Sequence, residues 1–260
     1  MAFFEMKYHS DALGMGVSVN IVLPESANTM IGMQASAKGE YKTLYLLHGL
    51  SDDHSIWMRR TSIERYASKY NLAVVMPGVG RSWYTDMANG AGYLTFVGDE
   101  LPGKCQSFFR GMSDKREDNI VAGLSMGGYG AIKVALTYPE RFGLCASLSG
   151  ALDVSKLDRL GSLAELRGIF GYELNSAEEL AGSAHDVFAI ARARAKKGLE
   201  FPRLYMWCGS DDYLLDNSQR FHKLLEELGI PHAYEESEGC HAWEWWDLHI
   251  QDALEYLLNT

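Results

Sequence analysis

The sequence predicts an α/β fold in which a mostly parallel sheet is covered by helices on both faces. Short apolar runs of strand length alternate along the chain with longer amphipathic stretches, a pattern typical of parallel strands joined by helices. The 260 residues include 47% hydrophobic and 22% charged side chains, the composition of an ordinary folded domain rather than a disordered or fibrous chain. No repeat, low-complexity tract or Pro- or Ser-rich linker divides the sequence, so we expect residues 1–260 to form a single domain.

The first two strands differ from the rest. Residues 3–9 and 15–23 alternate apolar and polar side chains, which predicts antiparallel edge strands with one solvated face. Residues 27–40 form a polar connector. Further strands are expected at 44–47, 72–76, 119–124, 144–149, 203–208 and 232–236. The expected helices cover 56–70, 92–109, 126–138, 216–228 and 242–258, and Pro102 interrupts the second of them.

Residues 151–200 lack any strand pattern and contain helical fragments separated by glycines. We interpret this stretch as a helical insertion after the sixth strand that forms a cap over the active site. Its glycines would also suit a mobile lid. Asp216, just before the next helical pattern, is expected to cap the N-terminus of that helix.

Charge and composition narrow the classes of partner. The net charge of -10 would repel nucleic acid and anionic membrane surfaces, because such partners need clustered Lys and Arg. No apolar run approaches the length of a transmembrane helix, and the opening residues lack the pattern of a signal peptide. Four cysteines without paired spacing are typical of a reducing compartment. The sequence therefore favours a cytoplasmic location.

The strongest chemical signal is a Gly-x-Ser-x-Gly sequence formed by Gly123, Ser125 and Gly127, with Leu124 and Met126 between them. It lies between a predicted strand and a predicted helix. A serine in so sharp a turn needs small neighbours, because a Cβ at either glycine would collide with the adjacent strand and helix. The alternative, a glycine-rich loop that merely contains a serine, does not account for this placement.

A serine hydroxyl needs a base, and the base needs a group that fixes its tautomer. The chain supplies both at predicted strand ends, in the order Ser, acid, His. Asp211 and Asp212 follow the strand at 203–208, and His241 follows the last strand. Among the eight histidines, His241 alone combines a glycine-containing loop with this order. The residue pattern does not choose between the two aspartates.

The turn after the strand at 44–47 contains His48, Gly49 and Leu50. In hydrolases with such a serine turn, a backbone N–H from this region and the N–H after the nucleophile bind the oxyanion. Leu50 and Met126 are therefore the expected donors.

Aromatic side chains are candidates for substrate binding. Trp57, Trp83 and Tyr84 would lie in loops or helix starts near the serine and could line the acyl or alcohol pocket. Packing in the core is the alternative for each of them.

Several segments together resemble the esterase D group of serine hydrolases, most closely the bacterial tributyrin esterases, over nearly the whole chain. They are Leu46 to Gly49, Asp53 to Trp57, Val74 to Pro77, Ser82 to Asp86, Ala122 to Gly130, Ser147 to Leu152 and Cys208 to Leu214. The resemblance implies an α/β-hydrolase fold and a serine carboxylesterase that hydrolyses short-chain acyl esters of the tributyrin or acetyl type through an acyl-enzyme. It also implies Asp212 as the acid, and neither a metal nor another cofactor.

Related activities stay open. The S-formylglutathione hydrolases are similar, but they usually carry histidines where this chain has Leu124 and Tyr129. Esterases that remove acetyl or feruloyl groups from plant polysaccharide share the same turn, so an oligosaccharide ester is also a possible substrate.

The sequence offers little support for two other classes of protein, a metal-dependent hydrolase and a non-catalytic binding protein. A metal-dependent hydrolase would have to use His48, His54, Cys240 or His241, of which only the last two are adjacent, a poor spacing for one ion. A non-catalytic binding protein with this fold would be expected to lack one member of the triad. Edge strands and an acidic surface would allow a homo-oligomer.

Overall fold

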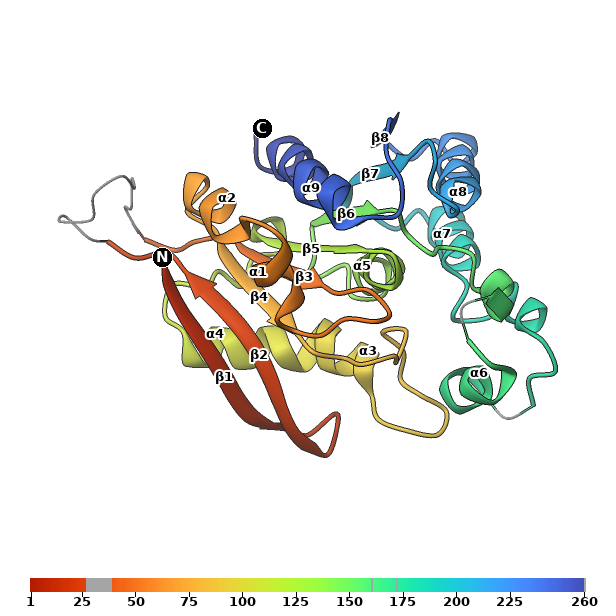
Figure 1. Ribbon diagram of the computed structural model, residues 1–260, viewed down its shortest axis with the longest axis horizontal. Helices are drawn as coiled ribbons and strands as arrows, with labels where there is room; N and C mark the ends of the chain where they lie inside the picture. Colours follow the sequence, from red (N-terminus) through yellow and green to blue (C-terminus); the bar gives the residue numbers. More distant parts are fainter. Residues whose placement is uncertain (27–38, 160, 172, 260) are drawn as a thin grey trace.

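A single mixed sheet organises the molecule. The computed structural model describes residues 1–26, 39–159, 161–171 and 173–259, so most of the predicted polar connector at 27–40 lies outside the described residues. Eight strands follow the order β1-β2-β4-β3-β5-β6-β7-β8 (Figure 1). They are β1 Ala2–Ser10, β2 Met15–Leu23, β3 Thr43–Leu47, β4 Ala73–Pro77, β5 Asn119–Leu124, β6 Leu144–Leu148, β7 Arg203–Gly209 and β8 His232–Ser237.

The strand directions confirm the predicted architecture. β1 pairs antiparallel with β2, and β2 pairs antiparallel with β4. All the remaining pairings are parallel, from β4 through β3, β5, β6 and β7 to β8. The three central strands β3, β5 and β6 are buried at every position, as expected for parallel strands covered on both faces.

Helices cover both faces of the sheet. They are α1 Ile56–Arg60, α2 Ile63–Lys69, α3 Tyr93–Thr95, α4 Leu101–Phe108, α5 Met126–Thr137, α6 Leu163–Phe170, α7 Val187–Lys196, α8 Leu215–Glu227 and α9 Trp243–Leu258, with a π-helical turn η1 Phe96–Glu100 and the 3-10 segments η2 Arg116–Asp118, η3 Val154–Arg159 and η4 Ala177–Leu180. Consecutive residues of β3 point to opposite faces, and each face has its own apolar core. Tyr45 and Leu47 pack in one core with residues of α4, α5, α7 and α8, whereas Leu44 and Leu46 pack in the other with residues of α1, α2 and α9.

The helix predicted at 56–70 is in fact two helices. Thr61, between α1 and α2, is extended, with φ -134° and ψ 171°. Its hydroxyl donates to the carbonyl of Trp57 and accepts from the N–H of Ile63. The N–H of Ser62 donates to a carboxylate oxygen of Asp247 on α9. The break is thus held by a helix far along the chain, and local periodicity does not reveal such a contact.

The helix predicted at 92–109 is continuous in outline but not uniform. α3, η1 and α4 follow one another without a gap. Pro102 occupies the first turn of α4, directly after the π-helical turn. Because Pro102 has no N–H to donate to the turn before it, the hydrogen-bond pattern of the continuous helix is interrupted at this residue.

The segment 151–200 contains η3, α6, η4 and α7. Its last helix, α7, contacts α5 and α8 and buries Val187, Phe188 and Ala191 in the core beneath the sheet. α7 is therefore one of the covering helices, and the residues before it lie beyond the strand ends (Figure 1). Asp216 does not cap α8. The N-cap is Leu214, and Asp216 lies in the first turn, where it pairs with Lys156 and Arg220.

Candidate active site

Parallel strands bring the predicted site residues to one edge of the sheet. Ser125 follows β5, Asp212 follows β7 and His241 lies between β8 and α9. Because these strands run in the same direction, their carboxyl ends meet at the same edge, where ligand sites of open α/β sheets are formed. Residues 116 positions apart along the chain thereby become neighbours.

Ser125 lies in a strained turn between β5 and α5. Its backbone has φ 54° and ψ -118°, a conformation that costs a non-glycine residue on the order of 1–3 kcal/mol. The turn is possible because Gly123 and Gly127 lack a side chain. A Cβ on Gly123 would run into the backbone of Gly127, and a Cβ on Gly127 would lie 2.7 Å from the carbonyl oxygen of His48.

The three predicted triad residues are in hydrogen-bond contact. Nε2 of His241 lies 3.0 Å from Oγ of Ser125. Nδ1 of His241 lies 2.9 and 3.1 Å from the two carboxylate oxygens of Asp212. A carboxylate only accepts, so Nδ1 carries the proton and donates it to Asp212, which leaves Nε2 to accept from the serine hydroxyl. This arrangement can withdraw the Ser125 proton as Oγ attacks a carbonyl.

Asp212 is held rigidly and lies away from solvent. Its side chain is fully buried, and its Oδ1 also accepts from the N–H of Leu214. Asp211 is exposed and uses its backbone N–H to bond the carbonyl of Gly239. The geometry therefore agrees with Asp212, the aspartate that the family resemblance implied. The sequence alone did not choose between the two.

Gly209 and Gly239 allow the acid and base loops to touch, a close approach that the sequence pattern did not predict. A Cβ on Gly209, at the end of β7, would collide with the backbone of Gly239, just before His241. Gly239 itself has φ 151°, which side chains rarely permit. In the sequence, the close approach of the two loops is indicated only by a glycine after each of the two strands.

The turn after β3 lies beside Ser125. A Cβ on Gly49 would lie 3.9 Å from Cβ of Ser125. Among the described residues, the backbone N–H groups of Leu50 and Met126 have no recorded acceptor. N–H groups placed this way next to a nucleophile can accept the charge that develops on a carbonyl oxygen.

His48 braces this turn. Its Nδ1 donates to the carbonyl of Gly49 at 2.7 Å, and its Nε2 accepts from the N–H of Val79 at 3.0 Å. These partners fit only the neutral ring, and burial lowers the pKa of His48. The side chain thus holds the turn in place and is not directed toward a substrate.

The three aromatic candidates for substrate binding are buried. Trp57, Trp83 and Tyr84 have exposed fractions of 1%, 2% and 0%. Trp57 donates from Nε1 to the carbonyl of Leu47, and the Tyr84 hydroxyl donates to the carbonyl of His48. These contacts favour the packing alternative, in which the rings support the end of β3. Contact of these rings with a substrate stays an untested prediction.

Two aromatic rings touch His241 directly, and the sequence did not single them out for this position. Tyr213, next to Asp212, lies with its ring centroid 4.6 Å from that of His241 and is 63% exposed. The ring of Trp246, from α9, is 4.8 Å from that of His241 on nearly perpendicular planes. Trp246 is almost fully buried and donates to Oγ of Ser149. The imidazole is thereby held between a buried ring and an exposed one.

Metal-ligating side chains gather elsewhere in the described part of the chain. The one group with suitable spacing is Glu235, His249 and Asp252. His249 is already bonded to Asp252 through Nδ1, and Glu235 accepts from the Tyr205 hydroxyl. A metal-dependent hydrolase would have to use His48, His54, Cys240 or His241. In His48 and in His241, both ring nitrogens are already hydrogen-bonded to protein groups.

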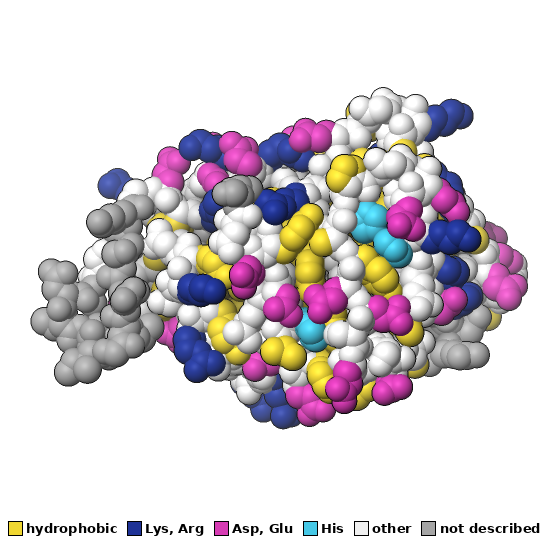
Figure 2. All heavy atoms as spheres, turned by 90° about the horizontal axis from the view of Figure 1, so that it is seen from above, with side chains coloured by type: hydrophobic (Ala, Val, Ile, Leu, Met, Phe, Trp, Pro, Cys, Tyr) yellow, Lys and Arg dark blue, Asp and Glu magenta, His cyan; other side chains and the backbone are white. Residues whose placement is uncertain are grey.

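The outer surface carries mixed charges. On the face shown in Figure 2, basic and acidic side chains are interspersed, and acidic ones gather toward the middle. Within the described ranges, no helix combines the length and apolar character needed to cross a membrane.

Comparison with known proteins shows the family to which the chain belongs. Residues 10–257 match the model of the Esterase family. An acetyl esterase from Caldicellulosiruptor saccharolyticus is 33% identical, and the match covers 99% of this chain and 98% of that protein.

Two solved structures from Staphylococcus aureus are similar along the whole chain. The fluorophosphonate-binding serine hydrolase FphF, with substrate bound, has a TM-score of 0.88 at 34% identity and covers 100% of this chain and 99% of its own. The S-formylglutathione hydrolase FrmB has a TM-score of 0.86 at 34% identity and covers 99% of both chains. The chain therefore belongs to the Esterase family and is an esterase D-like serine hydrolase with the α/β-hydrolase fold.

Proposed function

We propose that the protein is a carboxylesterase that hydrolyses short-chain acyl esters through an acyl-enzyme on Ser125. The observation that carries the proposal is the pair of contacts at His241, 3.0 Å to the Ser125 hydroxyl and 2.9 Å to the Asp212 carboxylate. The similarity to an acetyl esterase over 99% of the chain supports a small acyl group.

In the first half-reaction, Nε2 of His241 takes the hydroxyl proton of Ser125 while Oγ bonds to the ester carbonyl carbon. The resulting oxyanion is held by the N–H groups of Leu50 and Met126, each of which contributes ~10²–10³ in rate in comparable sites. His241 then gives its proton to the departing alcohol oxygen as the carbon–oxygen bond breaks. Asp212 stabilises the imidazolium in between.

In the second half-reaction, water replaces the alcohol. His241 takes a proton from the water as its oxygen attacks the acyl carbon, and returns that proton to Oγ of Ser125 as the acyl-enzyme bond breaks. The acid is released and the free serine is restored. The proposed steps need no group beyond these residues and water.

The direct test is the Ser125→Ala variant assayed with p-nitrophenyl acetate and p-nitrophenyl butyrate. We expect kcat to fall by ~10⁴-fold or more, because the nucleophile is lost. Circular dichroism would check that the variant is folded. Residual activity above a few per cent in a folded variant would contradict the role of Ser125.

Thioester hydrolysis is a second candidate, because a structure similar over 99% of the chain is an S-formylglutathione hydrolase. The same triad could hydrolyse a thioester, with a thiol as the leaving group in place of an alcohol. Measuring the hydrolysis rates of acetyl, butyryl and feruloyl esters and of a glutathione thioester would decide between oxygen-ester and thioester hydrolysis. A kcat/KM for the thioester at least ~10-fold above every oxygen ester would favour the second candidate.

We also propose that the protein resides in the reducing environment of the cytoplasm, which its free thiols support. All four thiols are free, with Cys105, Cys145 and Cys208 buried and Cys240 exposed. Burial raises the pKa of both Cys105 and Cys208 to about 12, so these two thiols are protonated and unreactive at neutral pH.

A further inference from the structure

Glu235, His249 and Asp252 form a cluster of metal-ligating side chains that contains no triad residue, and we call it the β8–α9 cluster. Glu235 lies on β8, the last strand at one edge of the sheet, and His249 and Asp252 lie one turn apart on α9. Each side chain offers one ligand atom, and these atoms all lie within 4.8 Å of one another. The proposed reaction uses none of the three.

The cluster joins a strand to a helix. Successive side chains of a strand alternate between its two faces, and Ala233, two residues before Glu235, packs in the same core as α9. Helix positions three apart share one face, and Nδ1 of His249 lies 2.8 Å from Oδ2 of Asp252. An ion held by these side chains would therefore fasten the edge strand to α9.

Neighbouring side chains hold two of the three ligands in place. The Tyr205 hydroxyl donates to Oε2 of Glu235 at 2.8 Å. Burial and, after it, this hydrogen bond raise the pKa of Tyr205, so the phenol stays a donor. The ring of His249 stacks on that of Trp207 with centroids 4.0 Å apart, and its Nε2 lies 3.5 Å from Oγ of Ser237. Metal-ligating histidines are commonly oriented in this way, through the ring nitrogen that does not bind the ion.

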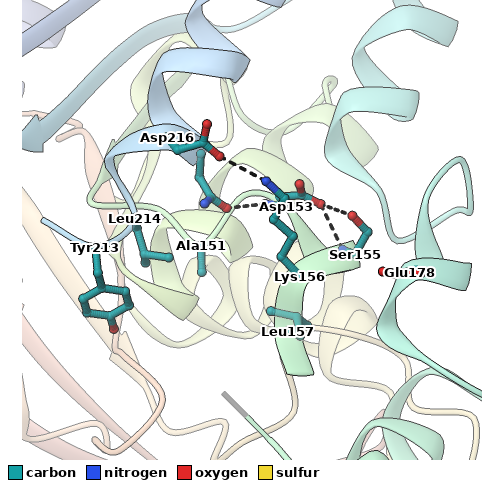
Figure 3. Close-up of a pocket in the computed structure, with 10 residues that line it drawn as sticks. Ala151, Asp153, Ser155, Lys156, Leu157, Glu178, Tyr213, Leu214 and Asp216 are labelled. Carbon is teal, nitrogen blue, oxygen red and sulfur yellow. Dashed lines mark hydrogen bonds and ion pairs between the residues drawn. The ribbon is translucent and has the colours of Figure 1, made fainter. Parts of the chain in front are cut away.

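The two carboxylates of the cluster lack a basic partner. Among the residues that the structure describes, no Lys or Arg forms an ion pair with Glu235 or Asp252. A pocket between η3 and the start of α8 shows the contrast, because Asp216 there pairs with Lys156 at 3.2 Å (Figure 3). At the β8–α9 cluster, a bound divalent cation would supply the positive charge that the protein itself does not.

The ligand types favour a transition-metal ion of the zinc type. An imidazole nitrogen combined with carboxylate oxygens is typical of Zn²⁺, whereas Ca²⁺ and Mg²⁺ prefer oxygen ligands alone. Bonds of about 2.0–2.2 Å to a tetrahedral ion would place the ligand atoms roughly 3.4 Å apart. His249 and Asp252 are already this close, and a rotation of the long Glu235 side chain would bring in the third ligand. Water would complete the coordination.

Binding of the ion changes the tautomer of His249. Without the ion, Nδ1 carries the ring proton and donates it to Asp252, because a carboxylate only accepts. With the ion, Nδ1 binds the metal through its lone pair, so its proton passes to solvent and Nε2 takes up another, which faces Ser237. The ring stays neutral and the number of bound protons is unchanged, while the ion balances the charge of the two carboxylates.

The cluster is open to solvent on the side of Asp252. The Asp252 side chain is 45% exposed, against 6% for that of His249. Asp252 also lines a surface pocket of about 200 Å³ between α2 and α9. Lys69, which lines the same pocket, lies over the ring of Tyr70. An ion can therefore reach the cluster from the surface.

We propose that Glu235, His249 and Asp252 form a structural site for a divalent cation of the zinc type, which fastens β8 to α9. The site takes no part in catalysis. It does not depend on the esterase reaction proposed above, so either proposal can fail without the other.

The test uses the full chain, freed of bound metal with EDTA and then titrated with Zn²⁺ in a calorimeter. We expect saturable binding of one ion per chain. At a free zinc concentration of ~100 times Kd, the midpoint of thermal unfolding should rise by ~5 °C or more, because the ion binds the folded chain. Absence of saturable binding, or no rise in the midpoint, would overturn the proposal.

Variants assign the ion to the cluster. Glu235→Gln and Asp252→Asn should each weaken zinc binding by ~10-fold or more, because a carboxamide brings no negative charge. Glu236→Gln on β8 and Glu255→Gln on α9 remove carboxylates outside the cluster and should keep the wild-type affinity. Each thermal shift is measured against the same variant in EDTA, so a change in basal stability does not enter the comparison. Unchanged affinity in either cluster variant, or equal weakening in the controls, would contradict the assignment.

Cys240 and His241 are adjacent and offer zinc a competing position. Because the proposed site does not use them, Cys240→Ser should bind zinc as the wild type does. Loss of zinc binding in Cys240→Ser, with wild-type affinity in Asp252→Asn, would place the ion beside the triad and overturn the proposal.

Discussion

Lys133 lies in the core, two turns after Ser125 on α5. The proposed reaction does not use its side chain. It is 1% exposed, and its Nζ donates to Oγ1 of Thr85 at 2.6 Å. The other close groups are the ring of Tyr129 at 5.3 Å and Nδ1 of His185 at 3.5 Å. No carboxylate pairs with Nζ within the described residues. Burial lowers the pKa of Lys133 to about 7, so its ammonium form is costly to keep inside the fold.

This burial predicts a pH dependence of stability. The pKa of Lys133 in the unfolded chain is the ordinary 10.5, so between about pH 7 and 10.5 the unfolded chain holds a proton that the folded one has lost. Stability then rises with pH, by at most ~1.4 kcal/mol per pH unit for one proton. Relative to Lys133→Met, the wild type should gain ~1–3 kcal/mol between pH 7 and 9 in urea unfolding. A wild-type-minus-variant difference that stays constant over this range would contradict the burial of the charge.

Single residues also mark the limit of sequence-based reasoning at the site. Ser125 and His241 could be predicted because their chemistry requires a particular order and strand-end positions, whereas Asp212 was preferred to Asp211 only through the family resemblance. Tyr213 and Trp246 could not be assigned to the imidazole, because their contacts with His241 depend on how β7, β8 and α9 fold back. The burial of Trp57, Trp83 and Tyr84 could not be predicted either. The sequence around an aromatic residue in a loop does not show whether its ring lines a pocket or packs behind one.

At the level of elements, the junction of β5 and α5 depends on glycines that admit no side chain. Gly127→Ala should destabilise the fold by ~1–3 kcal/mol or more and reduce esterase activity, since its Cβ would press on the carbonyl oxygens of Leu47 and His48. Gly103→Ala is the matched control on α4, where a Cβ meets nothing within 4 Å. It should be neutral or stabilising by up to ~1 kcal/mol.

Urea unfolding and p-nitrophenyl ester hydrolysis measure both glycine variants. A Gly127→Ala protein with wild-type stability and turnover would mean that the turn at Ser125 does not require the close approach described here.

Element boundaries were predicted well where they depend on local pattern and poorly where they depend on distant contacts. The strands of the parallel sheet follow their apolar runs to within about a residue or two. The division of the helix at 56–70 depends on Asp247, which accepts from Ser62 and from the Tyr66 hydroxyl across 181 or more positions. α7 was placed in the insertion because its weak apolar stripe does not show that it packs on α5 and α8.

At the level of the whole molecule, the sheet is stabilised from both faces. α9 supplies much of the core on the side of α1 and α2, and Leu254 on it is 1% exposed, whereas Leu248 on the same helix is 48% exposed. Leu254→Ala should lower the free energy of unfolding by ~2–5 kcal/mol through the cavity it leaves. Leu248→Ala should change it by no more than ~0.5 kcal/mol. Equal effects in denaturant unfolding would argue against the described packing of α9.

The account as a whole depends on an activated hydroxyl at Ser125. The most direct measurement is mass spectrometry of the intact and digested protein after reaction with a fluorophosphonate, which captures a serine only when a neighbouring base makes it nucleophilic. We expect a single adduct on the peptide that contains Ser125, no adduct in Ser125→Ala, and labelling slowed by ~10³-fold or more in His241→Ala. Equal labelling of the wild type and Ser125→Ala, or an adduct on another residue, would contradict the account.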